Sequence, residues 1–140
     1  MVEFSYAKGR IADSLQFILQ EIKEFEVEYN NKSWEQYHKD SKIQKLMEKT
    51  VENILTALLE VGGTILAEKG IATENYKEVL MKTAELFNFT KEEQESLSKL
   101  AVQRNRLAHR YLDLKWESIK MFKGQVNLIK KLLQKVLELQ

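Results

Sequence analysis

The chain contains no proline and only five glycines among its 140 residues. Both residue types interrupt helices and mark turns, so their scarcity favours a few long helices over many short strands. Near the start, apolar side chains recur at spacings of three and four, as a helix with one buried face requires. This stripe consists of Ile11, Leu15, Ile18, Leu19, Ile22 and Phe25. We therefore predict an all-α protein, an antiparallel bundle of four to five helices.

Local signals predict where these helices begin and end. Ser33 and Thr90 each open a capping box, because a Gln or Glu follows three residues later. Gly70 indicates a helix end, with Thr73 as the next N-cap. The expected helical segments are about 8–29, a long stretch from 33 to 65, a short one near 76–87, one from 91 to 107 and one from 115 to 139. The buried side of the short helix is predicted to consist of Tyr76, Val79, Leu80, Thr83 and Phe87.

Two consecutive glycines, Gly62 and Gly63, fall in the long second stretch. On an isolated helix each costs about 1 kcal/mol relative to alanine. Close packing against another backbone would explain both. They do not form a phosphate-binding loop, because no strand precedes them and no Lys-Ser/Thr pair follows.

Composition excludes several classes of function. The absence of cysteine excludes disulfides, thiolate metal sites and cysteine catalysis. The two histidines, His38 and His109, are far apart in the sequence, so we predict no metal site and no cofactor. No leader or membrane span is predicted, and we expect a cytoplasmic protein with one domain, residues 1–140. The net charge of +1 means that contact with nucleic acid requires a local basic patch.

Residues 103–116, QRNRLAHRYLDLKW, combine one histidine with several arginines, an asparagine and a tyrosine. On a continuous helix, Arg104 and His109 would diverge, because residues five apart point about 140° away from each other. They converge if the helix ends near the histidine. We expect the chain to leave this helix in an extended form, with Asp113 as the cap of the last helix.

These residue types suit the cleavage of RNA without a metal. Histidine accepts and donates protons near neutral pH, so it can activate a ribose 2′-hydroxyl or protonate the leaving oxygen. The guanidinium of an arginine matches phosphate oxygens and stabilises charge that builds on the phosphorus. Arg106 and Arg110 add local positive charge for phosphate contacts. The spacing alone has a simpler explanation, since basic residues at a helix C-terminus often only complement the helix dipole.

The segment RNRLAHRY, residues 104–111, resembles the Arg-x4-His-x-Tyr signature of the HepT-like branch of the HEPN superfamily. GGTILAEKG at 62–70 is similar to the end of that family's long second helix. ATENYKEVLMKTAELFNFTKEE at 72–93 is similar to its short third helix and the cap that follows. The order and spacing of the helices match from about residue 10 to residue 139.

The resemblance implies a homodimer of helical bundles, with the motifs of both copies in a cleft and RNA as the substrate. Arg104 and His109 would be catalytic, Asn105 a supporting polar group and Tyr111 the target of AMPylation. The partner would be an MNT-type nucleotidyltransferase that acts as the antitoxin to this toxin. An adenylyl group on Tyr111 would place bulk and negative charge where RNA phosphate must lie.

Two other functional hypotheses stay open at this point. The chain would instead be a non-catalytic helical subunit that binds a nucleotide or a protein within a nucleotidyltransferase complex, or a purely structural bundle. His38 is expected to be solvated. Aromatic side chains are able to stack on bases, but we expect the following four in the core or an interface instead: Trp34, Tyr37, Trp116 and Phe122.

Overall fold

A computed structural model describes residues 2–108 and 111–139, with side chains from residue 9 onward. The helices in this part of the chain are α1 (Val2–Glu28), α2 (Trp34–Lys39), α3 (Ser41–Glu68), α4 (Tyr76–Leu86), α5 (Lys91–Arg106) and α6 (Leu112–Glu138). The described residues contain no strand, which confirms the all-α prediction. The stretch that starts at residue 33 forms two helices because the backbone of Asp40 is extended (φ −116°, ψ 103°). The side chain of Asp40 then caps α3.

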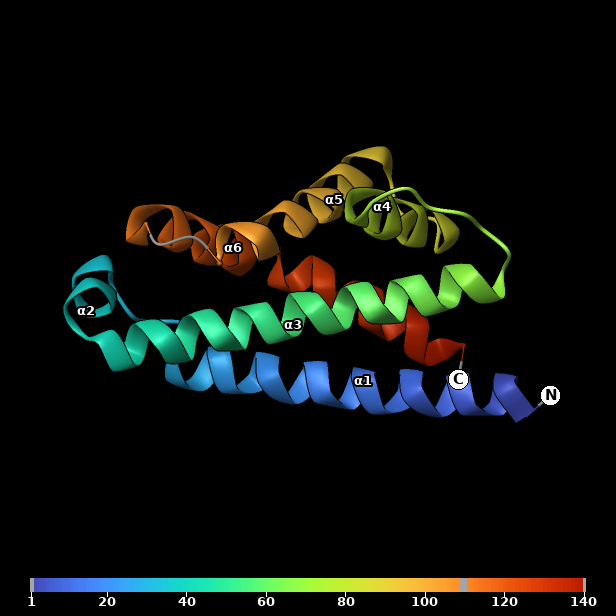
Figure 1. The fold of residues 1–140 in the computed structure, drawn as a ribbon, viewed down its shortest axis with the longest axis horizontal. Coiled ribbons are helices and arrows are strands. Elements are labelled where there is room, and N and C mark those ends of the chain that lie inside the picture. The colour runs from blue at the N-terminus through green and yellow to red at the C-terminus, as the bar shows by residue number, and fades with distance from the viewer. Residues whose placement is uncertain (1, 109–110, 140) are drawn as a thin grey trace.

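The long helix α3 lies at the centre of the bundle. α1 lies alongside α3 and runs antiparallel to it, and α6 packs against both (Figure 1). α4 and α5 pack against each other and against α3, on the side away from α1. Every other helix therefore contacts α3.

The core of the bundle is apolar and closely packed. Phe25 of α1 and Phe122 of α6 are fully buried and meet edge to face, with ring centroids 5.1 Å apart. α3 is long and apolar enough, by length and composition alone, to cross a membrane, but 61% of its most apolar window is buried inside the protein. This burial is what a central helix of a bundle requires.

The capping boxes are present at both predicted positions, Ser33 and Thr90. Gly70 ends the α3 region with a positive φ of 70°, as predicted. The prediction of Thr73 as the next N-cap was wrong. Asn75 caps α4 instead, and its side chain accepts a hydrogen bond of 3.0 Å from the backbone N–H of Glu78.

The prediction for the buried side of α4 was only partly right. Val79, Leu80 and Thr83 are buried, but Tyr76 is 52% exposed because it is the first residue of the helix. Phe87 lies at the C-cap, where it is partly buried against the core.

The two glycines of α3 differ in their surroundings. A Cβ atom on Gly62 would lie 2.8 Å from Thr83 Oγ1 and 3.1 Å from Val79 Cγ1, so Gly62 allows α4 to approach α3 closely. A Cβ atom on Gly63 would meet nothing within 4 Å. Close packing therefore explains Gly62 and does not explain Gly63.

Candidate functional site

The segment that carries the motif joins α5 to α6. α5 ends at Arg106, followed by Leu107 as the C-cap, and the N–H of Ala108 donates to the carbonyl of Asn105 (3.1 Å). The predicted helix end near the histidine is thus present. His109 and Arg110 lie outside the described residues, so the predicted convergence of Arg104 with His109 stays a prediction.

The predicted extended exit from this segment was wrong from Leu112 onward. α6 begins at Leu112, directly after Tyr111, whose backbone is extended (φ −82°, ψ 114°) and whose side chain makes no capping hydrogen bond. Asp113 lies inside the first turn of α6 and is not its cap. A carboxylate in the first turn of a helix is still favourable, because it faces the positive end of the helix dipole.

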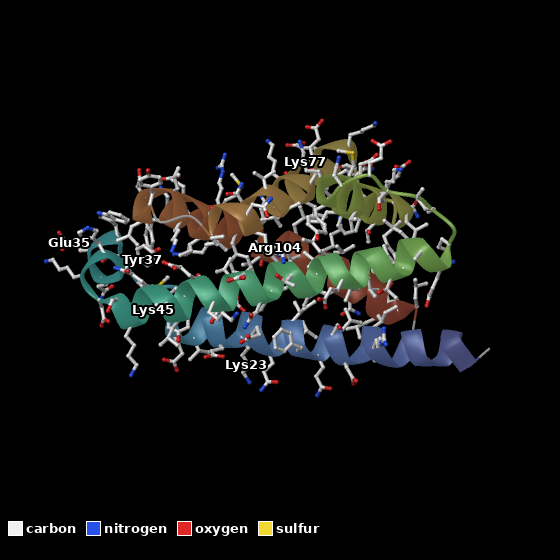
Figure 2. The ribbon with its side chains drawn as sticks, in the orientation of Figure 1. Lys23, Glu35, Tyr37, Lys45, Lys77 and Arg104 are labelled. Carbon is white, nitrogen blue, oxygen red and sulfur yellow. The ribbon has the colours of Figure 1, made fainter. Side chains whose placement is uncertain are left out.

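Arg104 lies in the last turn of α5, where it contacts two other helices. Its Nε donates a hydrogen bond of 2.8 Å to Oγ1 of Thr56 on α3. The ring of Tyr76, the first residue of α4, lies 5.5 Å from the guanidinium carbon, which is within the range of a cation–π contact. Figure 2 shows Arg104 at the middle of the bundle, above α3. A long and flexible side chain is thereby held at the junction of three helices.

Arg104 also lines a surface hollow of about 500 Å³ between α1 and α3. Its charged residues are three carboxylates and two cations: Asp13, Glu52, Glu60, Lys49 and Arg104. The carboxylates repel phosphate. Within one copy of the chain, this hollow is therefore a poor phosphate site despite the presence of Arg104.

The other described residues of the motif lie at the surface. Asn105 and Arg106 are exposed at the end of α5, and Tyr111 is 62% exposed before α6. The structure thus anchors Arg104 to α3 and α4, and leaves Asn105, Arg106 and Tyr111 accessible to a partner molecule. These positions neither confirm nor contradict the predicted roles.

A family model described as "Ribonuclease HepT-like" matches residues 18–136. The chain belongs to the HepT-like ribonuclease family. The match includes helices α2 to α5 and the whole segment 104–111, and it confirms the resemblance noted from the sequence. No curated protein matches the chain.

The HepT-like chain has fewer unpaired basic groups near the motif than its sequence suggests. Lys115 is mostly buried and pairs with Glu48 at 3.0 Å, and Lys120 pairs with Glu117 at 3.0 Å. Lys123 donates to the carbonyl of Asn30. Arg106 is exposed in the last turn of α5, and it makes no ion pair with another described residue.

An aromatic cluster lies where α2 meets α6. Tyr37 is fully buried, its ring centroid lies 5.0 Å from that of Trp116, and its hydroxyl donates to Glu48 at 2.5 Å. Burial raises the pKa of Tyr37, and the hydrogen bond to Glu48 and the charge of that carboxylate raise it further. Trp34 covers the cluster at the surface. The ring of His38 contacts that of Trp34 at a tilt of 37°, with centroids 5.1 Å apart, and His38 is exposed as predicted.

These contacts confirm the prediction for three of the four aromatic residues in the HepT-like chain, whereas Trp34 is 38% exposed and is not part of the core. Tyr37 is part of the core, Trp116 packs against that core, and Phe122 is fully buried against Phe25. The sequence did not single out Thr56 or Glu48, and it placed Tyr76 only on the buried side of a helix, not beside Arg104. Thr56 and Glu48 carry no local signal, since each is an ordinary helical residue that becomes important only through a contact distant in the chain.

Proposed function

We propose that this protein is a metal-independent endoribonuclease toxin, with Arg104 and His109 acting together at the cleft of a homodimer. The observation that supports this most is the motif Arg104-x4-His109-x-Tyr111 in a chain that belongs to the HepT-like ribonuclease family. The anchoring of Arg104 by Thr56 and Tyr76 adds to it. A guanidinium that is already oriented has less to lose in entropy when it meets charge on phosphorus.

In the proposed reaction, His109 accepts the proton of the ribose 2′-hydroxyl while the 2′-oxygen attacks the adjacent phosphorus. The bond between that phosphorus and the 5′-oxygen of the next nucleotide breaks, which leaves a 2′,3′-cyclic phosphate. The 5′-oxygen takes up a proton, and Arg104 stabilises the negative charge on the non-bridging oxygens. The reaction consumes no cofactor.

A homodimer supplies what a single motif lacks. One histidine must serve as base and another group as acid, and a second copy brings its own His109 to the same cleft. The carboxylates beside Arg104 repel RNA within one copy, so the positive charge of Arg106 and Arg110 from two copies would favour binding.

Tyr111 is the proposed regulatory site. It is 62% exposed, so a second enzyme can reach its hydroxyl. In the proposed modification by an MNT-type nucleotidyltransferase antitoxin, the tyrosine oxygen attacks the α-phosphorus of ATP, releases pyrophosphate and loses its proton to solvent. The new phosphodiester places a negative charge two residues from His109, where it repels the phosphate of RNA.

The test is cleavage of labelled RNA in EDTA by the parent and by Arg104→Ala, His109→Ala and Tyr111→Phe. We expect the parent and Tyr111→Phe to cleave, and the other two to lose activity by at least about a hundredfold, as for a missing acid–base group. Lys120→Ala is the matched control, since Lys120 pairs only with the neighbouring Glu117 among the described residues. Equal cleavage by the parent and His109→Ala would contradict the assignment.

A second candidate is a non-catalytic helical subunit that binds a nucleotide or a protein in a nucleotidyltransferase complex. The carboxylates that line the hollow beside Arg104 favour it, because they suit a basic protein surface better than RNA. Expression without the nucleotidyltransferase separates the two. A toxin arrests growth, whereas a binding subunit has no effect.

A further inference from the structure

We propose that Thr56 is the positioning residue for Arg104. Its hydroxyl fixes the guanidinium through Nε and leaves the two terminal amino groups for phosphate. This inference rests on the proposed function, because it assigns a role to Thr56 in the same reaction. Thr56 lies 48 residues before Arg104, on a different helix, and outside the Arg-x4-His-x-Tyr motif.

The hydrogen bond from Nε to Thr56 leaves the two terminal nitrogens of Arg104 for an end-on contact with phosphate. A guanidinium carries five N–H groups in a planar fork, and its two terminal nitrogens form the bidentate pair that matches two phosphate oxygens. In this structure Nε donates to Thr56 Oγ1 at 2.8 Å, and the terminal nitrogens make no hydrogen bond to another described residue. The hydrogen bond therefore orients the guanidinium of Arg104, and its two terminal nitrogens stay available for phosphate.

The other threonines of α3 show that the hydroxyl of Thr56 is used differently. Thr50 and Thr64 each donate to the carbonyl four residues earlier, at 2.8 Å, which is the usual bond of a helical threonine. Thr56 makes no such bond to a described residue, and accepts from Arg104 instead. Its β-branched side chain has few rotamers, so the accepting oxygen is held in place.

Tyr76 contacts the same guanidinium through its aromatic ring. Its ring lies 5.5 Å from the guanidinium carbon, and it comes from the start of α4. The hydrogen bond holds Nε, and the ring contact holds the guanidinium near the start of α4. Two contacts from two helices leave the arginine fewer conformations to lose when substrate binds.

The first measurement is the rate of RNA cleavage by Thr56→Val, which keeps the shape of the side chain and removes the hydroxyl. We expect kcat to fall by about tenfold, which corresponds to the loss of one hydrogen bond to a charged group. Thr56→Ser should recover kcat to within about threefold of the parent. Thr64→Val is the matched control, because it places the same change in α3 on a threonine that does not contact Arg104.

The second measurement does not depend on activity. The Arg104 Nε–H signal, assigned in 15N NMR spectra by its loss in Arg104→Lys, should persist at neutral pH in the parent and broaden in Thr56→Val. The hydrogen bond slows exchange of this proton with water. The absence of a protected Nε–H in the parent would overturn the inference even if every variant were poorly active.

The outcomes separate this inference from the function on which it rests. If Arg104→Ala is inactive and Thr56→Val cleaves like the parent, the positioning role is wrong and the nuclease assignment stands. If Thr56→Ser loses as much activity as Thr56→Val, the hydroxyl is not responsible, and the inference is again overturned. If Arg104→Ala cleaves like the parent, the proposed function is wrong, and the positioning role of Thr56 is then wrong as well.

Discussion

Ser118 and Gln103 join the helices on either side of the motif through a hydrogen bond in the core. The Ser118 hydroxyl lies 2.9 Å from Gln103 Oε1, and both side chains are almost completely buried. Gln103 directly precedes Arg104 at the end of α5, and Ser118 lies in the second turn of α6. This pair therefore holds α5 and α6 together close to the point where the chain passes from one to the other.

Ser118→Ala should destabilise the protein by about 1–3 kcal/mol, because it leaves the Gln103 carbonyl oxygen buried without a donor. Urea unfolding measures this change. The double variant Gln103→Met with Ser118→Ala removes both partners and should recover part of the loss. Equal free energies of unfolding for the parent and Ser118→Ala would show that the hydrogen bond contributes nothing.

The two neighbouring glycines of α3 provide a second prediction, with one as the control for the other. Gly63→Ala should stabilise the helix by up to about 1 kcal/mol, because alanine has the higher helix propensity and its Cβ meets nothing within 4 Å. Gly62→Ala gains the same propensity, but its Cβ would lie 2.8 Å from Thr83 Oγ1. Overpacking of this kind costs about 1–3 kcal/mol.

Thermal unfolding of both variants tests this difference. We expect the midpoint of Gly63→Ala at or above that of the parent, and the midpoint of Gly62→Ala clearly below that of Gly63→Ala. In a Thr83→Ala background, Gly62→Ala should lower the midpoint by less, since the clashing oxygen is then absent. Matching midpoints for the two single variants would mean that α4 moves away from α3 at no cost.

The features that the sequence predicted correctly are those encoded locally. Helix periodicity and the capping boxes at Ser33 and Thr90 involve residues three or four apart, so they are readable without the fold. The error at the start of α4 arises because Thr73 and Asn75 are both competent N-caps, so the sequence alone did not distinguish them.

The surroundings of Arg104 were not predictable in the same way. The sequence marked Arg104 because it lies in a recognisable motif, but its partners Thr56 and Tyr76 are brought to it by tertiary packing. The basic character of the region was overestimated for the same reason. Lys115 counts as a free cation in the sequence, and becomes a partner of Glu48 only when α6 packs against α3.

The raised pKa of Tyr37 leads to a prediction of how the free energy of unfolding changes at alkaline pH. Burial raises the pKa of its hydroxyl above that of an unfolded tyrosine, which is about 10. Below pH 10 the stabilisation from this group is complete. Above it, the unfolded chain loses the proton and the folded chain keeps it, so the free energy of unfolding falls by about 1.4 kcal/mol per pH unit for this one group.

Urea unfolding of the parent and Tyr37→Phe between pH 8 and 11 measures this dependence. We expect Tyr37→Phe to be less stable at pH 8, because it loses the hydrogen bond to Glu48. Its stability should then fall less steeply above pH 10 than that of the parent. Parallel curves for the two proteins would show that Tyr37 ionises as readily in the folded state as in the unfolded one.

Arg106 provides the prediction that bears most directly on RNA. It is exposed in the last turn of α5, and it is one of the residues proposed to contact phosphate. In an inactive His109→Ala background, Arg106→Gln should weaken the binding of single-stranded RNA at low salt. A plot of log K against log salt concentration has a negative slope, and each lost phosphate contact should make it less steep by about 0.7, as counterion release requires for single strands.

The control for Arg106 is Lys23→Gln, which removes one positive charge from the exposed face of α1, on the opposite side of α3 from Arg104 in Figure 2. Both variants change the net charge equally. If long-range charge alone governs binding, the two substitutions lower the affinity to the same extent and leave the salt slope equal. A direct contact at Arg106 instead reduces the slope in Arg106→Gln and leaves it unchanged in Lys23→Gln, because only a cation that touches a phosphate releases a counterion when RNA binds.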